Sequence, residues 1–428
     1  MPFNTTLGIE RSYYVATARE RVASPPLLDE IETDFCVVGG GCTGLSGALH
    51  AAERGFRTVL LEGGRIGWGA SGRNGGQMIP GLRKSAVELV GLYGKERART
   101  IFQTADAARD LVVDLIRRHG IACDLKQTGH LEAAIKPKEM RHLAEEAECQ
   151  AQTMGYRHMR LLSAGEVRAE LGTDRYHGGL VDGLGGHLHP LNYTLGLADA
   201  ASRAGVQIYE QSPAVALEES ATGVIVRTMT GVVRAKYALL AGDAFLGALD
   251  EGLARKIMPV ANYVVATAPL PDPAAIIRHD RAVSDTKFVV DYYRLTADGR
   301  LLFGGGERYT PDPPADIAGF VRPYLERVFP QLAGIAIDHA WGGLVSVTLS
   351  RMPDIGRRGN LFYAHGYSGK GVILTTLAGQ LVAEAMAGTA ERFDIMASVA
   401  PPAFPGGTAL RYPLYVLGML WYALRDRL

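Results

Sequence analysis

Gly39 to Gly44 (GGGCTG) have the spacing G-x-G-x-x-G, which is a pattern that can bind phosphate. The apolar run DFCVV before them predicts a buried strand, and TGLSGALHAAER after them has helical spacing. In such a unit Gly39 permits the tight turn, Gly41 lets the main chain approach a pyrophosphate, and Gly44 lets helix and strand pack closely. The phosphates then lie at the positive end of the helix. The pattern therefore predicts a dinucleotide site.

Glu62 follows a second predicted strand, TVLL (58–61). An acidic residue at this distance from the glycines is placed to accept hydrogen bonds from both ribose hydroxyls of an adenosine. A carboxylate there disfavours a 2′-phosphate, and hence NADP. The motif alone does not choose between FAD and NAD.

A second glycine-rich run, GGRIGWGASGRNGGQ (63–77), comes directly after Glu62. Glycine loses more conformational entropy on folding than any other residue, so the run needs a reason to leave the main chain bare. FAD supplies one, since its ring system has to be approached edge-on, with Ser71, Asn74 and Gln77 as polar contacts. A flexible surface loop is the alternative, which the nearby Trp68 disfavours. The place of Arg73 stays undecided.

Several further segments occur in a characteristic order, and together they resemble the D-amino-acid oxidase superfamily of FAD amine oxidoreductases. Within it the chain is most similar to the bacterial gamma-glutamylputrescine oxidases, from about residue 10 to the C-terminus. The segments are GGGCTG, LLEGGRIGWGASGRNGGQ, GGHLHPLNYTLGLADA, DYYRLTADGRLLFGGG, TLSRMPDIGR, HGYSGKGVILTTLAGQLVAEA and FPGG.

The resemblance implies an α/β fold with a Rossmann-type (GR2-like) FAD-binding domain and a substrate domain with a mostly antiparallel sheet. Both are expected to be built from non-contiguous segments. We expect residues 30–85, 150–250 and 340–400 in the FAD domain, 86–149 and 251–339 in the substrate domain, and 401–428 as a C-terminal docking segment. Phe288 to Gly306 predicts a hairpin of the substrate sheet, with its turn at Ala297 to Gly299.

The stretch from His365 to Gly388 predicts a strand, a glycine turn and an apolar helix that begins near Val372. By its position it resembles the family segment beside the flavin pyrimidine, where a helix N-terminus favours the negative charge of reduced flavin. Lys370 stands where family members commonly carry His. It either stabilises the reduced flavin or superoxide, binds a substrate carboxylate, or simply extends to solvent.

The resemblance and the motifs give two sets of candidate residues. The expected catalytic residues are Lys370, Tyr367, Trp341 and Arg294. The expected FAD contacts are Gly39, Gly41, Cys42, Thr43, Gly44, Glu62, Gly63, Arg65, Ala70, Ser71, Asn74, Gly75, Gly76, Gln77, Val215, Gly242, Gly369, Lys370, Gly371 and Val372. Family members usually carry Asn after the glycine at 242, whereas this chain has Asp243.

Flavin oxidation of an amine needs the protein to desolvate a neutral amine and to hold its C–H near flavin N5. Sarcosine-oxidase relatives bind a carboxylate next to the reacting carbon with an Arg and a Lys. Gln77 and Ile373 fall near those positions, which favours an amine such as gamma-glutamylputrescine, oxidised to an imine that water hydrolyses, with O2 as acceptor. Arg294 or Arg351 could still bind a carboxylate, so an imino acid such as L-pipecolate stays open.

Three other functions remain as alternatives. One is an amino-acid or imino-acid dehydrogenase that passes electrons to a membrane carrier through the C-terminal segment. The others are a non-catalytic FAD protein and an NAD-dependent dehydrogenase, of which the second is disfavoured by the glycine-rich run. Covalent flavin in sarcosine-oxidase relatives uses a Cys near the position of Val345, so we expect non-covalent FAD.

Composition excludes other classes. Lys plus Arg and Asp plus Glu number 45 each, which disfavours nucleic-acid binding. The four cysteines form no CxxC pair, which fits a reducing cytoplasm. His187 and His189 (HLHP) are expected to stabilise a turn, and we expect no metal site. The apolar stretch Pro413 to Leu424 is too short to span a membrane; it suits a buried helix, with a peripheral membrane contact left open.

Overall fold

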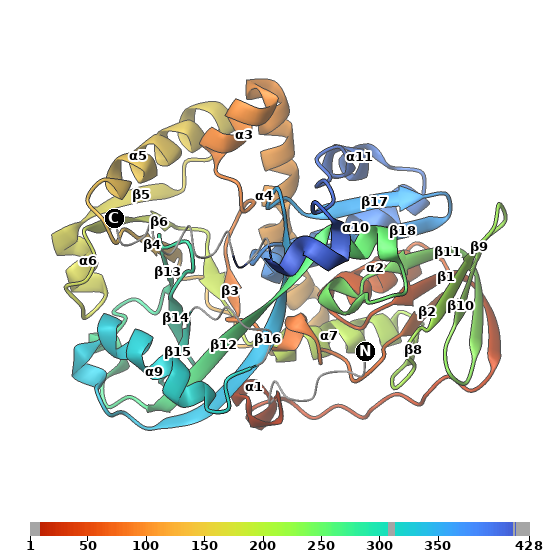
Figure 1. Ribbon diagram of the computed structural model, residues 1–428, viewed down its shortest axis with the longest axis horizontal. Helices are drawn as coiled ribbons and strands as arrows, with labels where there is room; N and C mark the ends of the chain where they lie inside the picture. Colours follow the sequence, from red (N-terminus) through yellow and green to blue (C-terminus); the bar gives the residue numbers. More distant parts are fainter. Residues whose placement is uncertain (1–8, 307–312, 414–415, 417–428) are drawn as a thin grey trace.

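The computed structural model describes residues 9–306, 313–413 and 416. Figure 1 shows two sheets side by side, with long strands running between them. The α-helices are α1 (Tyr13–Ala16), α2 (Cys42–Ala52), α3 (Ala86–Tyr93), α4 (Lys95–His119), α5 (Glu139–Cys149), α6 (Ala164–Glu170), α7 (Pro190–Arg203), α8 (Glu251–Ala254), α9 (Ile317–Val328), α10 (Gly371–Met386) and α11 (Glu391–Ala397). Shorter helical turns are η2 (Ile9–Arg11), η3 (Ala70–Gly72), η4 (Gln150–Met154), η5 (Asp243–Phe245), η6 (Pro273–Ala275) and η7 (Pro330–Leu332).

The first sheet has the order β17-β18-β11-β1-β2-β8, with β10 and β9 as an antiparallel extension of β11. Its central strands are parallel, and their buried parts are apolar runs, namely FCVV at the end of β1, ALL at the end of β11 and VLL in β2. Its strands are β1 (Glu30–Val38), β2 (Thr58–Leu61), β8 (Gln207–Tyr209), β9 (Ala216–Glu219), β10 (Val224–Arg227), β11 (Val232–Leu240), β17 (Asp354–Arg358) and β18 (Leu361–His365). The strand, helix and strand predicted around the glycine motif are thus confirmed as β1, α2 and β2.

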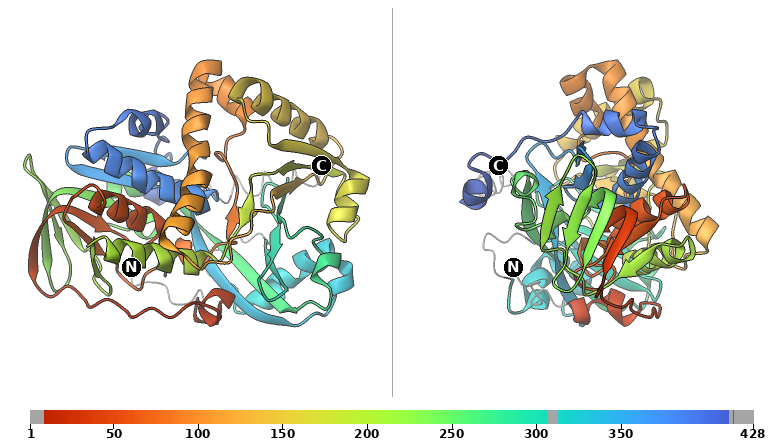
Figure 2. Two further views of the ribbon diagram at one scale, coloured as in Figure 1. Left: turned by 180° about the vertical axis from the view of Figure 1, so that it is seen from behind. Right: turned by 90° about the vertical axis from the view of Figure 1, so that its right-hand side faces the viewer.

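Helices α2, α7 and α10 cover one face of this sheet (Figure 2, left). Helix α10 crosses α2 at a very short distance, because each helix has a glycine at the crossing, Gly379 in α10 and Gly47 in α2. A Cβ on Gly379 would lie 2.4 Å from both Gly47 N and Thr43 O. The Ser46 hydroxyl donates to Thr376 O at 2.6 Å across the same contact. The crossing therefore fixes the first turn of α2 relative to α10.

The second sheet has the order β16-β12-β15-β14-β13-β4-β6-β5 and is mostly antiparallel. Its strands are β4 (His130–Ala133), β5 (Met159–Ser163), β6 (Gly178–Asp182), β12 (Ile257–Pro269), β13 (Ala282–Asp285), β14 (Tyr292–Leu295), β15 (Arg300–Gly304) and β16 (Ile337–Thr348). Strands β14 and β15 form the predicted hairpin, whose turn includes Gly299 at φ +74°. The fold class predicted from the sequence is confirmed by these two sheets.

The sheets divide the chain at other places than the expected boundaries. Strands β5 and β6 lie inside the segment 150–250, which was expected in the FAD domain, yet they pair in the second sheet. Strand β16 likewise takes residues 340–348 into the second sheet. Local patterns predict a strand but not the distant strand with which it pairs. We therefore propose a division that follows the sheets, with β5, β6 and all of β16 in the substrate domain.

Strands β3 (Gln77–Met78) and β7 (Gly186–His187) pair with each other and belong to neither of the two large sheets. Helix α4, which the sequence assigned to the substrate side, contacts α10. Among the described residues no helix combines the length and the apolar character needed to cross a membrane. Half of the expected docking segment 401–428, including most of its apolar stretch, lies outside the described residues.

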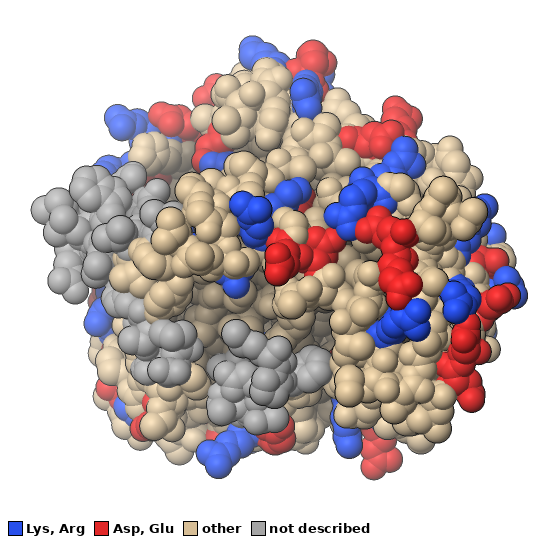
Figure 3. Space-filling model, turned by 45° about the vertical axis from the view of Figure 1, so that its right-hand side comes forward, with Lys and Arg blue, Asp and Glu red and all other residues tan. Residues whose placement is uncertain are grey.

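Lys and Arg side chains lie interspersed with Asp and Glu on the face shown in Figure 3. This face therefore presents no large area of a single charge, in agreement with the equal numbers of basic and acidic residues in the sequence.

Candidate active site

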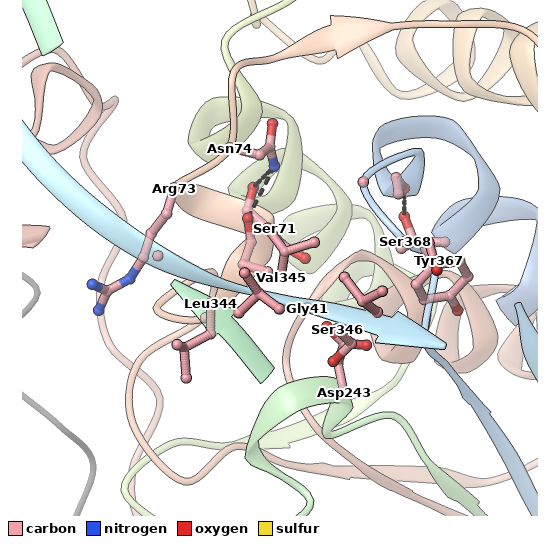
Figure 4. Close-up of a pocket in the computed structure, with 18 of the residues that line it drawn as sticks. Gly41, Ser71, Arg73, Asn74, Asp243, Leu344, Val345, Ser346, Tyr367 and Ser368 are labelled. Carbon is pink, nitrogen blue, oxygen red and sulfur yellow. Dashed lines mark hydrogen bonds between the residues drawn. The ribbon is translucent and has the colours of Figure 1, made fainter. Parts of the chain in front are cut away.

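A cavity of about 1080 Å³ lies between the two sheets. Its size is at the upper end of the roughly 300–1,000 Å³ typical of small-molecule sites. The glycine motif, the glycine-rich run, β16 and the turn before α10 all contribute to its lining. Figure 4 shows these segments converging, with Gly41 and Ser71 beside β16 and Tyr367 on the far side.

The three motif glycines have the geometry that their predicted roles require. Gly39 has φ +119°, and a Cβ on it would lie 2.6 Å from Ala241 O. A Cβ on Gly44 would lie 2.0 Å from Gly39 O, so only glycine permits this approach of helix to turn. A Cβ on Gly41 would lie 2.8 Å from the Ser71 hydroxyl, inside the cavity lining.

Glu62 lies at the end of β2 with its carboxylate against main-chain N–H groups. Oε2 accepts from Gly40 N at 2.6 Å and Oε1 accepts from Gly64 N at 2.7 Å. Burial raises the pKa of Glu62, although these two hydrogen bonds act to lower it. The carboxylate thus links the glycine motif to the glycine-rich run.

The glycine-rich run is an ordered turn held by its own polar side chains. Asn74 Nδ2 donates to Ala70 O at 3.0 Å and to Ser71 O at 3.2 Å, while its Oδ1 accepts from Gly76 N at 2.8 Å. The Ser71 hydroxyl accepts from Cys42 N at 3.0 Å, at the N-terminus of α2 (Figure 4). The alternative of a flexible surface loop is excluded by these contacts.

Arg73, whose place the sequence left undecided, is buried and connects the run to β16. Its Nε donates to Trp68 O at 2.7 Å and one Nη donates to Gly342 O at 3.1 Å. The guanidinium lies 4.4 Å from the centre of the Trp68 ring. Burial lowers the pKa of Arg73 to about 10.

Arg294 and Trp341 do not line this cavity, so neither is retained as a substrate contact. Arg294 donates to Gly75 O at 2.7 Å and to Leu188 O at 3.0 Å, and it is only 3% exposed. The Trp341 indole donates to Arg73 O at 2.9 Å and is fully buried. Both side chains donate to main-chain carbonyls of the glycine-rich run, Arg294 from β14 and Trp341 from β16.

The turn before α10 brings Tyr367 and Lys370 to the cavity. The Tyr367 hydroxyl is 2.8 Å from the Thr43 hydroxyl in the first turn of α2. Lys370 Nζ donates to Pro80 O at 3.2 Å. Burial lowers the pKa of Lys370, and the nearby Glu132 acts to raise it. The predicted extension of Lys370 to solvent is therefore disfavoured.

Asp243, which follows Gly242, has φ +46°. Its carboxylate accepts a hydrogen bond from Gly366 N at 3.0 Å. It thus joins the end of the first sheet to the turn before α10. The two histidines of HLHP have structural partners: His189 caps α7 by accepting from Asn192 N, and His187 contacts Asp280. No group of three possible metal ligands occurs among the described residues.

The structure brings most of the predicted residues together. Those that line the cavity are Gly39, Gly41, Cys42, Thr43, Glu62, Gly63, Ala70, Ser71, Asn74, Gly75, Gln77, Gly242, Tyr367, Gly369, Lys370, Gly371 and Val372. Those outside the lining are Gly44, Arg65, Gly76, Val215, Arg294 and Trp341. Val215 is half exposed, while its neighbours Pro213 and Ala214 do line the cavity.

One lining residue that the sequence analysis missed is Asn262. Asn262 of β12 accepts a hydrogen bond from the Tyr292 hydroxyl at 2.5 Å, and both residues line the cavity. Tyr263, its neighbour, is buried in the core of the second sheet. Alternation along β12 could have shown that Asn262 is the polar residue of an otherwise apolar strand face.

Comparisons with known proteins agree with this geometry. Residues 34–385 match the family described as FAD dependent oxidoreductase (DAO), and the chain belongs to this family. It is 44% identical to the gamma-glutamylputrescine oxidoreductase of Escherichia coli (strain K12) over 97% of this chain and 98% of that one. It is 38% identical to a probable oxidoreductase, OrdL, of Haemophilus influenzae over 97% of both chains.

Solved structures show the same fold. The L-proline dehydrogenase of P. horikoshii has a TM-score of 0.71 at 21% identity, covering 91% of this chain and 97% of that one. The glycine oxidase of Geobacillus kaustophilus has a TM-score of 0.70 at 22% identity, covering 87% and 96%. The resemblance stated from the sequence is thus confirmed, and the protein is an FAD-dependent oxidoreductase with FAD as its cofactor.

The residues present fit that cofactor. The bare main chain at Gly39 and Gly41, the N-termini of α2 and α10, and the carboxylate of Glu62 all face one cavity. Helix N-termini favour the anionic parts of a dinucleotide. A Cβ atom on Gly39 or Gly41 would be too close to neighbouring protein atoms, so these positions need glycine to keep the main chain bare for the cofactor.

We predict that Arg294→Met weakens FAD retention, because it removes the charged donors that hold Gly75 and Leu188. Loss of a hydrogen bond to a charged group costs about 1.5–3 kcal/mol. The FAD dissociation constant should therefore rise and the melting temperature should fall. Fluorescence titration of apoprotein and thermal unfolding measure the two effects. Arg57→Met, at the surface pair with Asp34, is the matched control. Unchanged FAD affinity together with a raised KM for the amine would instead assign Arg294 to the substrate.

Proposed function

We propose that this protein oxidises an amine C–N bond to an imine, which water hydrolyses, with gamma-glutamylputrescine as the amine and O2 as the electron acceptor. Similarity to the Escherichia coli gamma-glutamylputrescine oxidoreductase over nearly the whole of both chains carries the proposal. Bound FAD supplies the hydride acceptor.

The geometry near the expected carboxylate clamp supports an amine without a carboxylate on its reacting carbon. Gln77 Nε2 donates to Val283 O at 2.8 Å and to Tyr293 O at 3.1 Å, so its donors are used within the protein. Ile373 is apolar and 1% exposed. Neither position offers a cation that could bind a carboxylate there.

The lining also suits the desolvation of a neutral amine. Tyr292 presents its ring to the cavity, and the hydrogen bond to Asn262 fixes the orientation of that ring. Met258 and Val260 add apolar surface from β12. An apolar wall disfavours the ammonium form, which has no lone pair to assist loss of hydride from the neighbouring carbon.

We propose that Lys370 provides positive charge beside the N-terminus of α10. Its ammonium is held by Pro80 O and by the field of Glu132, and the helix N-terminus adds to it. Negative charge that develops in the cavity when the cofactor accepts a hydride is stabilised by such a fixed cation.

Reduction by the substrate tests the proposed function. We expect the visible flavin absorbance of the purified protein to bleach on anaerobic addition of gamma-glutamylputrescine, and to return on admission of air with formation of peroxide. L-Pipecolate is the comparison substrate. Bleaching by L-pipecolate and not by gamma-glutamylputrescine would contradict the proposal in favour of an imino-acid enzyme, and bleaching without peroxide would indicate a dehydrogenase.

Lys370→Met should retain FAD but slow reduction or reoxidation by roughly 10- to 100-fold, the size expected for removal of one charged donor. Because burial lowers the pKa of Lys370, the wild-type rate should fall as pH rises through that pKa, and the variant should lack this limb. Stopped-flow measurement of each half-reaction across pH gives both results. Lys84→Met is the control, since Lys84 lines the same cavity but is paired with Glu88 at 2.6 Å. Wild-type rates for the Lys370 variant would refute the role.

A further inference from the structure

The described lining of the cavity includes several cations, which differ in what holds them. They are Arg73, Arg83, Lys84, Arg351 and Lys370. Arg73 and Lys370 donate to main-chain carbonyls, and Lys84 is ion-paired. Arg83 is exposed at the surface. Two of them lie against aromatic rings of the lining, Arg73 against Trp68 and Arg351 against Phe288. Arg351 is the one in the turn just after β16.

Arg351 lies in the turn that follows β16, the strand whose last residues line the cavity. Its backbone N–H donates to Thr348 O at 3.2 Å, which closes the turn. Its φ is +63°, in the left-handed region that residues other than glycine seldom adopt. Such backbone conformations cost free energy and cluster at functional sites. The turn therefore holds the Arg351 side chain at the end of the strand.

The Arg351 guanidinium lies 5.1 Å from the centre of the Phe288 ring. Phe288 begins a segment, Phe288 to Val290, that also lines the cavity, so the pair joins β16 to the segment between β13 and β14. Leu349 contributes apolar surface to the same lining. A guanidinium stacked on a ring keeps its planar donors in one orientation, and an apolar surrounding strengthens its attraction to an anion.

We propose that Arg351, supported by Phe288, binds the carboxylate at the end of the substrate remote from the amine that is oxidised. The inference rests on the proposed function. A gamma-glutamyl amine has an α-carboxylate separated from its reacting carbon by the aminobutyl and glutamyl chains. A guanidinium is suited to bind a carboxylate with two parallel hydrogen bonds. If the substrate carboxylate is bound far from the reacting carbon, no cation is needed at Gln77 or Ile373, the positions near the expected carboxylate clamp.

Steady-state kinetics of Arg351→Gln on two substrates test the inference. For gamma-glutamylputrescine we expect KM to rise about 10- to 100-fold with kcat largely retained, because a remote contact contributes equally to ground-state and transition-state binding. For the analogue in which the α-carboxylate is a carboxamide, wild type and variant should have similar KM. Arg351→Lys should recover only part of the loss, since Lys cannot form the paired hydrogen bonds. Arg57→Gln, at the surface pair with Asp34 and outside the cavity lining, is the matched control and should leave both substrates unaffected.

A binding measurement separates recognition from chemistry. Gamma-glutamylbutylamine has the carboxylate but lacks the terminal amine at which oxidation is proposed. Calorimetry with the oxidised holoenzyme should show weaker binding to Arg351→Gln than to wild type or Arg57→Gln. An unchanged visible spectrum establishes that FAD is still bound in the variant.

The inference is overturned if Arg351→Gln loses equally on the carboxylate and carboxamide substrates. It is likewise overturned if Arg83→Gln, which replaces another cation of the lining, shows the selective loss and Arg351→Gln does not. It is also overturned, with amine oxidation itself intact, if wild type bleaches with amines that lack a carboxylate and not with gamma-glutamylputrescine. Failure of every amine to bleach the wild-type flavin would instead refute the proposed function.

Discussion

The crossing of α2 and α10 is the contact on which the site depends. At Gly379 the two main chains approach so closely that a Cβ would lie 2.4 Å from Gly47 N. The Tyr367–Thr43 hydroxyl contact and the Ser46–Thr376 hydrogen bond secure the two ends of the crossing. Because of this geometry the N-termini of both helices open on one cavity, although more than 300 residues separate them in the chain.

The position of the two helix N-termini determines where in the cavity negative charge is favoured. Each helix N-terminus carries a partial positive charge from its free N–H groups, and glycines leave those groups accessible. A dinucleotide has anionic character at its pyrophosphate and, when reduced, at its ring system. A single crossing thus supplies both electropositive positions, and residues of β12 and β16 in the second sheet line the same cavity.

Local signals in the sequence predicted the first sheet and the hairpin well. The turn at Gly39 and the close packing at Gly44 depend on residues that are close in the chain, and the structure has the geometry expected of both. Glu62 lines the cavity, and its contact with the ribose stays a prediction. The hairpin of β14 and β15 was predicted for the same reason, since its turn and alternation are contained in one short segment. The family resemblance supplied the cofactor, which the motif alone left open.

Features that depend on distant pairing were not predictable in this way. Strands β5 and β6 have ordinary strand patterns, and only the pairing of β6 with β4, and of β5 with β6, places them in the second sheet. Arg294 was expected to contact substrate because arginine binds carboxylates, yet its donors are used on main-chain carbonyls of the glycine-rich run and of the segment before α7. Composition gives the capacity of a side chain, whereas burial and strand register decide which partner it meets.

The central claim is that the cavity between the sheets holds FAD without a covalent bond. Acid precipitation of the purified protein, with mass spectrometry of the supernatant, tests this claim most directly. We predict equimolar FAD in the supernatant and colourless precipitate, in keeping with the expectation drawn from Val345. Flavin that stays with the precipitate would contradict the non-covalent site. Protein that contains no flavin and cannot be reconstituted with FAD would contradict the account as a whole.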